Sequence, residues 1–527
     1  MGLVSSLLET IELAPPLLTR DAERAAGSLV ELVGMDVYAG STAACDRAIY
    51  FLARRGIEKF LCLAWNRDLT PQAETRFVGV DRAGVIDGIF VNMRICATDH
   101  ENAVSLRKDL PFTAPEAIGV KKSAGLGDRL GLATPGHVRA IRGLPIKPFF
   151  AQQSIREMTR THRTPEEVMD CATWGVFQEG YRDGFGADAD HLKTTEDVDR
   201  TVAAGFTMYT IDPGDHVDNA AETDDQSALM RKFEALPWEE LETTAADCRK
   251  AYAGTGPRIG PDFELAVSQE DLLRAAVKYG RAIAHAVMLY RHLVEKMSGT
   301  AFELEMSVDE TATPTSPAEH AYVASELRRL GVKWVSLAPR FVGEFEKGVD
   351  YIGDLALFEE AFARHVQIAR HLGPYKISLH SGSDKFSIYP IAARLAGELV
   401  HVKTAGTSYL EALRAIAGID PGLFREIVDF AFQRYEEDKP SYHVSGDPRK
   451  VARPKALRDD ELAGLLDSFD GRQLLHVTYG SVLTVKDTDG LYRFRDRLLL
   501  ALRRDEEAHY AAVSAHIRKH VAPFASA

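Results

Sequence analysis

Cysteine is scarce in this chain of 527 residues, with five in all and no two spaced as a CxxC metal or redox pair. A sparse, odd number of cysteines is typical of proteins whose thiols stay reduced, so we expect a cytoplasmic protein without disulfides. The chain also has no apolar run of about 18 residues, the length that a membrane-spanning helix needs. We therefore expect no membrane partner.

Positively charged side chains are fewer than negatively charged ones. The chain carries 63 lysines and arginines against 77 aspartates and glutamates, a formal net charge of −14. Nucleic-acid binding draws on basic surface, so we expect no nucleic-acid partner, although a local basic cluster could still hold a small anion. The sequence has no P-loop, no GxSxG elbow and no HExxH helix. Its GLGDRLG segment at 125–131 departs from the GxGxxG fingerprint, so we expect no nucleotide cofactor.

From about residue 119 onward, short strand-like runs alternate with amphipathic helical patterns, which predicts an α/β fold with a parallel sheet covered by helices. Eight such strands predict a closed (β/α)8 barrel over residues 119–527, and a ninth candidate implies an insertion or a miscounted strand. The predicted strands are 185–191, 206–212, 302–310, 334–340, 376–382, 399–405, 441–447 and 474–480, with 125–134 as the ninth. The predicted helices are 268–297, 316–330, 355–371, 407–417, 421–437 and 491–519.

Two further segments are less regular. Residues 1–118 mix short helices with strand-like runs such as 59–65 and 88–98, and we expect a smaller N-terminal α/β extension there. The acidic, Pro- and Gly-punctuated stretch 213–262 is expected to be a surface insertion or a lid.

Polar and apolar residues alternate within several of the predicted barrel strands. Leu304 and Met306 alternate with Glu305, and Val402 alternates with His401 and Lys403. A period of two places each set on one face of a strand, so the apolar set is expected to meet the helices and the polar set to point into the barrel. Barrel interiors favour bulky apolar side chains, so polar residues there indicate a site for a polar ligand.

Several strands carry side chains that can bind a metal or move a proton. Asp190 and His191 lie at the end of one strand, Glu305 in the middle of another, and His380 at the start of an HSGSDK segment. Imidazole and carboxylate groups on neighbouring strands suit Zn, Mn, Co or Ni, so we expect a divalent metal cation. Simpler explanations are a helix cap, a salt bridge from Glu305 to a barrel lysine, and a solvated loop after the histidine. Four histidines fall on predicted strands: His380, His401, His443 and His476.

A second set of residues could hold an anionic substrate near the barrel mouth. Arg340, Lys385 and Lys403 follow or end predicted strands and could bind a carboxylate or a phosphate. Asp384 lies beside Lys385 in the loop after its strand, and Ser123 opens the GLGDRLG turn.

Long motifs in residues 119–490 resemble the bacterial tagaturonate epimerases. The motifs are SAGLGDRLGLATPGH, GFGADADHLKT, FELEMSVDET, KISLHSGSDKFSIYP, HVKTAGTSYLEALR and LLHVTYGSVL. The resemblance implies a metal-dependent isomerase of hexuronate catabolism that interconverts D-tagaturonate and D-fructuronate at C4. A more distant likeness to the class II aldolases, which are metal-dependent barrels, implies Asp190 as an acid/base group and His191 and His380 as metal ligands. We expect His443 as the third ligand, with His401 and His476 as alternatives.

C4 of such a substrate is β to the C2 ketone, so breaking and re-forming the C3–C4 bond is a chemically accessible route to inversion. We assign Asp190 and Glu305 as the pair that moves protons. An aldolase or isomerase acting on a related keto-sugar or keto-sugar acid and an inactive sugar-acid sensor are the alternatives. The expected partner is a small sugar acid, and a homo-oligomer is an open alternative.

Overall fold

The structure is a computed structural model that describes residues 2–252, 254–258 and 264–525. Eight parallel strands form a closed barrel, in which consecutive strands are neighbours and the last pairs with the first. This confirms the predicted (β/α)8 fold. The barrel strands are β7 (Ser123–Gly125), β8 (Lys147–Ser154), β9 (Gly186–Leu192), β10 (Met208–Ile211), β13 (Glu303–Ser307), β14 (Ser336–Ala338), β15 (Lys376–Leu379) and β16 (Val400–Lys403).

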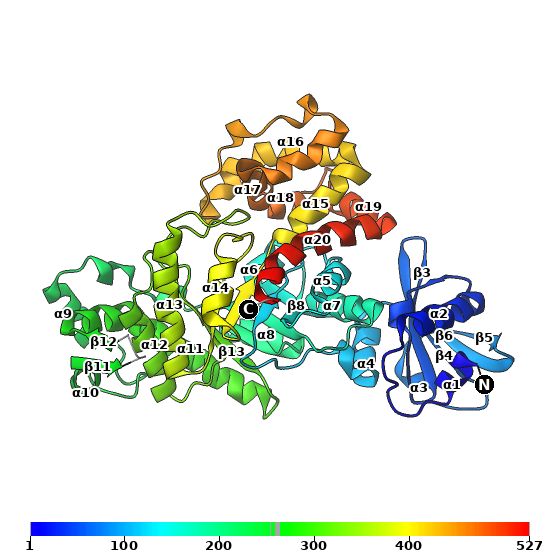
Figure 1. Ribbon diagram of the computed structural model, residues 1–527, viewed down its shortest axis with the longest axis horizontal. Coiled ribbons are helices and arrows are strands. Elements are labelled where there is room, and N and C mark those ends of the chain that lie inside the picture. Colours follow the sequence, from blue (N-terminus) through cyan, green and yellow to red (C-terminus); the bar gives the residue numbers. More distant parts are fainter. Residues whose placement is uncertain (1, 253, 259–263, 526–527) are drawn as a thin grey trace.

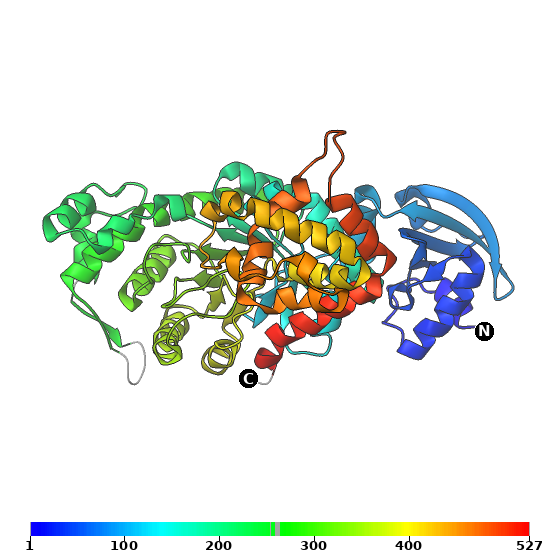
Figure 2. The same cartoon turned by 90° about the horizontal axis from the view of Figure 1, so that it is seen from above.

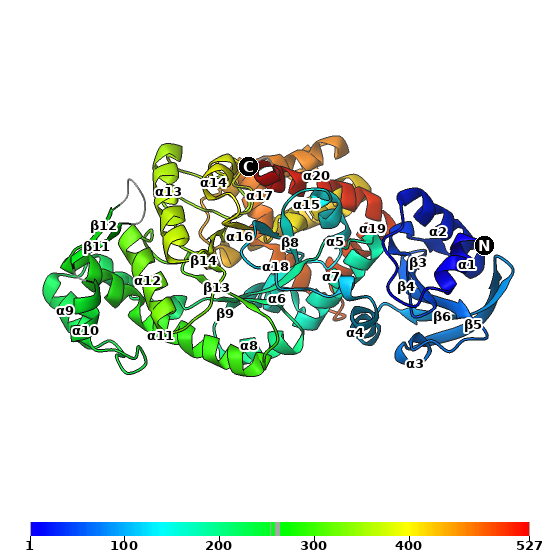
Figure 3. The same cartoon turned by 60° about the horizontal axis from the view of Figure 1, so that its bottom comes forward.

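Helices surround this barrel, with α11, α12 and α13 on one side and α5 and α7 on the other (Figure 3). Several begin at capping boxes, in which a Ser or Thr side chain and an acidic residue three positions later satisfy free backbone N–H groups. Ser268 caps α11 in this way, at the first residue of the predicted helix 268–297. The outer helices are α5 (Thr134–Ile141), α7 (Pro165–Glu179), α8 (Thr195–Ala203), α11 (Gln269–Met297), α12 (Pro317–Arg329), α13 (Leu355–Leu372), α14 (Tyr389–Ala396) and α20 (Glu506–Ala525).

Two predicted strands are wrong, the candidate 125–134 shares only Gly125 with β7, and one strand was missed. Residues 441–447 form no strand, and 474–480 lie in the helices α17 (Phe469–Val477) and α18 (Tyr479–Thr484). A short run that is buried on all sides has the same apolar pattern as a strand or as a helix, so LLHVTYG was ambiguous. The missed strand is β8. Its Pro148 and two consecutive glutamines are unusual in an interior strand, so the sequence did not predict one there.

The inward and outward faces of the strands are as the alternation predicted. Leu304 and Met306 pack in the apolar core shared with the surrounding helices. Glu305 and Lys403 lie inside the barrel, where their charged groups are 3.0 Å apart. The interior of this barrel is therefore ionic at the level of the site.

The N-terminal residues form a separate six-stranded antiparallel sheet beside the barrel (Figure 1). The two expected strands correspond to β4 and β6, and helices α1 (Leu3–Leu8) and α2 (Thr19–Val33) cover one face. The division at residue 118 stays a prediction. The strands are β1 (Asp36–Val37), β2 (Ala43–Cys45), β3 (Ala48–Arg55), β4 (Glu58–Asn66), β5 (Gly79–Ile86) and β6 (Ile89–Ala97), followed by α4 (His100–Asp109).

After β16 the chain leaves the barrel and builds a helical group with its own apolar core. This group comprises α15 (Thr407–Ile419), α16 (Pro421–Asp438), α17, α18 and α19 (Arg495–Arg504). Seen from above, it lies across the barrel (Figure 2), and α20 then returns to pack against α5 and α14. The group matters for function because α17 and α18 form one wall of the site described below.

The irregular stretch 213–262 contains α9 (Gln226–Glu234) and α10 (Ala245–Tyr252), both of which pack against α11. Residues 253 and 259–263 of this stretch lie outside the described residues. No helix in the described part of the chain is long and apolar enough to span a membrane.

Candidate active site

A narrow polar pocket lies at the carboxyl ends of the barrel strands, where sites of this fold are found. Asp190 and His191 enter it from β9, His380 from the end of β15 and Lys403 from β16. The pocket adjoins an outer hollow of about 420 Å³ that shares His380, Arg156, Lys347 and Tyr442 as lining residues.

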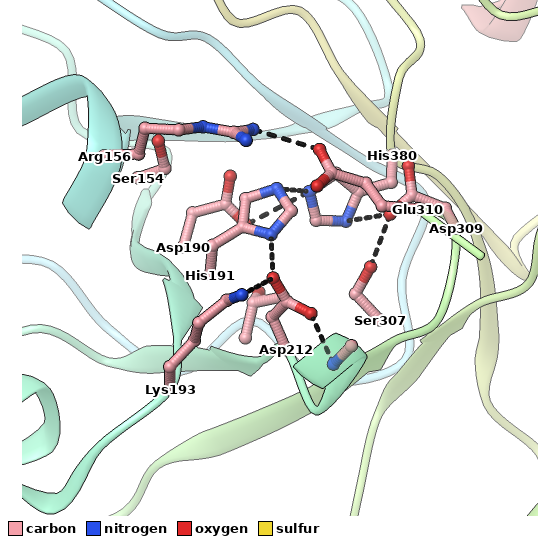
Figure 4. A network of polar contacts seen from close by, with 12 residues as sticks. Ser154, Arg156, Asp190, His191, Lys193, Asp212, Ser307, Asp309, Glu310 and His380 are labelled. Carbon is pink, nitrogen blue, oxygen red and sulfur yellow. Dashed lines mark hydrogen bonds and ion pairs between the residues drawn. The ribbon is translucent and has the colours of Figure 1, made fainter. Parts of the chain in front are cut away.

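Two histidine rings meet in this pocket (Figure 4). His191 Nε2 lies 2.9 Å from His380 Nε2. The Nδ1 atom of each ring faces a carboxylate, at 3.0 Å from Asp212 for His191 and at 3.3 Å from Glu305 for His380. Asp212 fixes a proton on Nδ1 of His191 and leaves its Nε2 as an acceptor, whereas Glu305 lies within ion-pair distance of His380 Nδ1 without a hydrogen bond. The two Nε2 atoms are so close that either a proton or a metal ion must lie between them.

A backbone irregularity brings consecutive residues Asp190 and His191 into the same pocket. Neighbours in a regular strand point to opposite faces. His191 has a positive φ of 54°, and the register between β9 and β10 shifts at this point. A β-bulge of this kind redirects a side chain and is common beside active sites.

Lys403 lies at the centre of the buried charges. Its ammonium group is 2.8 Å from both Asp188 and Asp190 and 3.0 Å from Glu305, and it also donates to Thr210 at 2.8 Å. Burial disfavours the charge of Lys403, but the three carboxylates hold its pKa well above the usual range. With its donors engaged, Lys403 keeps the carboxylates ionised and has little capacity left for the substrate carboxylate that we expected it to bind.

The electrostatics of the histidine pair reflect the same acidic surroundings. Burial lowers the pKa of His380, but Asp309 and Asp190 outweigh this and raise it to about 10. Burial likewise opposes ionisation of Asp190, while Lys403, His380 and His191 hold its pKa well below the usual range. Asp190 is therefore a carboxylate at neutral pH.

These residues fit a metal ion. Asp190, His191 and His380 each bring one potential ligand atom within 4.8 Å of the others. The carboxylates on the far ring nitrogens are the usual support of metal-binding histidines, and the nitrogen and oxygen donors suit a divalent transition metal.

The expected third ligand, His443, lies outside this group. It sits in a loop, its side chain is 69% exposed, and it contacts Glu344 at 2.7 Å. The two alternatives are also separate from the group: His401 lies deeper in the barrel, 2.8 Å from Ser123, and His476 lines the opposite wall of the pocket from α17.

Four expected substrate-binding residues also lie away from the inner pocket. Ser123 is part of the deeper layer, where it accepts a hydrogen bond from Lys376. Arg340 lines the outer hollow and donates to the carbonyl of Thr311. Asp384 and Lys385 do not line the pocket, because the loop after His380 turns them into separate buried contacts. Their expected role in substrate binding stays a prediction.

Those contacts hold the mouth loops together. The Lys385 ammonium donates to the carbonyls of Glu346, Val349 and Ser383, and burial lowers its pKa to about 7. Asp384 forms an ion pair with Arg472 at 2.8 Å.

A second group with metal-binding side chains comprises Asp384, His516 and His520. Arg472 already compensates the charge of Asp384 there, and His520 Nε2 accepts the backbone N–H of Asp384 at 2.9 Å. We therefore interpret this group as an ionic network that fixes α20 to the loop after β15.

Most residues of the wall opposite the histidines were missed by sequence reasoning. They come from loops and helices far apart in the chain, where no strand pattern marks them. They are Arg156, Glu157, Arg160, Lys347, Tyr442 and Tyr479.

The structure explains the GLGDRLG turn, in which the sequence singled out no role for Arg129. Asp128 accepts the backbone N–H groups of Leu130, Gly131 and Ala133 and so fixes the turn. Arg129, the residue after Asp128, lines the pocket.

The central ion cluster leads to a stability prediction. Replacing Lys403 with methionine should destabilise the barrel by about 3–5 kcal/mol, because three buried carboxylates lose their counter-charge. Thermal and denaturant unfolding would measure this. Lys347→Met is the matched control: Lys347 donates to Ser381 and has no carboxylate within ion-pair distance among the described residues, so its unfolding should change little. Wild-type stability of Lys403→Met would contradict the role assigned to Lys403.

Comparison with known proteins places this chain in a family. The family model described as UxaE, tagaturonate epimerase, matches residues 38–524. A tagaturonate/fructuronate epimerase from Thermotoga maritima is 45% identical over 488 residues, covering 93% of this chain and 96% of the relative. A glycerol-complexed crystal structure of the fructuronate-tagaturonate epimerase UxaE from Cohnella laeviribosi aligns with a TM-score of 0.87 and 38% identity, covering 96% of this chain and 99% of that one. The YdjI aldolase of Escherichia coli aligns only at 10% identity and a TM-score of 0.31. The chain belongs to the tagaturonate epimerase family.

Proposed function

We propose that this chain interconverts D-tagaturonate and D-fructuronate by inverting C4. The observation that carries the proposal is the convergence of His191 Nε2 and His380 Nε2 beside the ionised Asp190 at the barrel mouth. The family is named for tagaturonate, and the relative from Thermotoga maritima is named for both sugar acids.

We propose that His191 and His380 hold a divalent cation, which would supply Lewis-acid stabilisation of negative charge on substrate oxygens. Asp212 orients His191 through the hydrogen bond at Nδ1, and Glu305 lies 3.3 Å from His380 Nδ1, where its charge favours a proton on that nitrogen. A cation held by two protein side chains would remain accessible to substrate oxygens, as catalytic metal ions are.

Asp190 is the proposed proton acceptor. Its Oδ1 accepts from Lys403 at 2.8 Å and its Oδ2 accepts from Gln152 at 3.2 Å, so the carboxylate is fixed in the pocket. The ammonium group beside Oδ1 would repel a metal ion there, which favours the acid/base role over ligation. Asp190 would take the C4 hydroxyl proton as the C3–C4 bond breaks, leaving an aldehyde at C4 and an enediolate at C2–C3. Rotation of the aldehyde, re-addition of C3 and return of the proton to O4 complete the inversion.

Glu305 was expected to share this proton transfer. It is fully buried one layer below the pocket and does not line it. We therefore propose that Glu305 acts as a positioning residue for His380. Asp190 alone would transfer the proton.

Incubation with D-tagaturonate, followed by ¹H NMR, tests the proposed reaction. We expect D-fructuronate to accumulate to a stable ratio, with loss of turnover on chelation and recovery on adding a divalent metal. Accumulation of smaller carbonyl fragments would show an aldolase instead, and binding without turnover would show a sugar-acid sensor.

A further inference from the structure

Three polar side chains on the wall opposite the histidines are buried without satisfying their hydrogen-bonding groups. Within the described residues, both ring nitrogens of His476, the hydroxyl of Tyr479 and the Nη1 atom of Arg129 have no hydrogen-bond partner. His476 and Tyr479 are each 1% exposed and Arg129 is 5% exposed, and all three line the pocket. Leaving such groups unpaired costs about 1–3 kcal/mol each, so their convergence on one cavity points to a ligand there.

The wall that carries these groups has more cations than carboxylates, whereas the opposite wall is acidic. Glu157 already accepts from Arg129 Nε and Nη2, at 2.8 and 2.5 Å, so Nη1 is the nitrogen of Arg129 left for a ligand. Arg129 lies on the face of the Tyr479 ring, 3.6 Å from its centroid. Nearby, Arg160 donates to Tyr442 at 2.5 Å and Lys347 donates to Ser381 at 2.8 Å, and neither forms an ion pair with a described residue. The other wall carries the carboxylates gathered around Lys403. An anionic group of a bound ligand would therefore face the basic wall and avoid the acidic one.

The protonation of His476 suits it to donate a hydrogen bond. Burial, followed by the neighbouring Arg129 and Lys347, holds the pKa of His476 well below its usual range, so the ring is neutral. A neutral imidazole has one N–H donor. With the Tyr479 hydroxyl and Arg129 Nη1, the wall offers three donors to one acceptor group.

The backbone leaves room for this arrangement at Gly406, just after β16. Gly406 has a φ of 92°, and a Cβ there would lie 2.6 Å from His476 Cε1 and 2.7 Å from Arg129 Nη2. The absence of a side chain at Gly406 lets the two groups reach the pocket beside the end of the strand that carries Lys403.

We propose that Arg129, His476 and Tyr479 form the subsite for the carboxylate of the uronate substrate. This inference rests on the proposed function and deepens it, because it explains why an acid is bound at the same site as the metal-binding histidines. Donors that converge on a carboxylate form hydrogen bonds about twice as strong as those between neutral groups. The wall would hold the acid end while Asp190 and the histidines act on C4.

Tyr479→Phe and His476→Leu test this proposal. Calorimetry with an equilibrated tagaturonate–fructuronate mixture should show a Kd about 10–100-fold higher for each variant, from the loss of a hydrogen bond to a charged group. In steady-state assays KM should rise more than kcat falls, as for the loss of uniform binding. The thermal unfolding temperature should not fall, because neither substitution removes an intramolecular hydrogen bond, and bound metal should be unchanged.

Tyr409→Phe is the matched control. Tyr409 is also 1% exposed with an unpartnered hydroxyl, and its ring lies 6.1 Å from that of Tyr479, but it does not line the pocket. Its Kd should equal that of the wild type. Wild-type Kd values in Tyr479→Phe and His476→Leu, or an equal loss in Tyr409→Phe, would overturn the subsite. Absence of turnover in the wild-type protein would instead overturn the proposed function, so the two failures are distinguishable.

Discussion

Replacing Asp190 with asparagine should lower kcat for the interconversion by about 10²–10⁴-fold, the usual contribution of a positioned acid/base group. The amide keeps the shape of the carboxylate and can still contact Lys403, but it cannot take the C4 hydroxyl proton. Because two histidines hold the proposed cation, the metal content per chain should stay at the wild-type level. Steady-state kinetics and elemental analysis of the same preparation measure both quantities.

Asp215→Asn is the control for this variant. Asp215 is an exposed carboxylate that pairs with Lys193 at 3.0 Å and does not line the pocket, so kcat should be unchanged. If Asp190→Asn lost its metal in proportion to its activity, Asp190 would be a metal ligand and the acid/base assignment would be wrong. Full activity in Asp190→Asn would rule out both roles.

Replacing His191 or His380 with alanine should weaken metal binding by more than about 100-fold, because even outer residues that orient a ligand contribute 10–100-fold. Each ring supplies one of the two Nε2 atoms that converge at 2.9 Å. Activity should fall with the metal content and recover in part when excess divalent metal is added. Titration of the chelated protein with metal, followed by calorimetry and by turnover, measures affinity and activity together.

His443→Ala is the matched histidine control, since this exposed side chain pairs with Glu344 and lies outside the ligand group. It should bind metal as the wild type does. Loss of metal from His443→Ala would restore the third ligand that the sequence first suggested, and retention of metal in His380→Ala would show that His380 is not a ligand.

The sequence predicted the parts of the molecule that depend on local periodicity. The alternation around Glu305 and Lys403 predicted a polar barrel interior, and the strand ends at Asp190, His191 and His380 predicted the side chains that meet in the pocket. Parallel barrel strands bring their carboxyl ends to one rim, so residues at those ends are neighbours even when far apart in the chain.

The parts of the fold and site that the sequence did not predict depend on contacts between distant residues, which local periodicity does not encode. His476 looked like a strand residue because a helix buried on all sides has no polar face, and it reaches the pocket only because the C-terminal helices fold over the barrel. Asp384 and Lys385 looked suited to the substrate because they follow His380, but a positive φ of 59° at Asp384 accompanies the turn away from the pocket. The end of β15 and the loop after it therefore supply one proposed metal ligand and then a structural anchor.

The proposed breaking and re-forming of the C3–C4 bond is tested most directly by following D-tagaturonate in D₂O by ¹H NMR with the metal-loaded enzyme. Breaking and re-forming the C3–C4 bond never removes the hydrogen on C4, so the D-fructuronate formed should keep its full C4 proton signal. Deuterium at C4 of the product would show deprotonation at that carbon and would contradict the mechanism proposed for Asp190. Failure to form D-fructuronate at all would contradict the function.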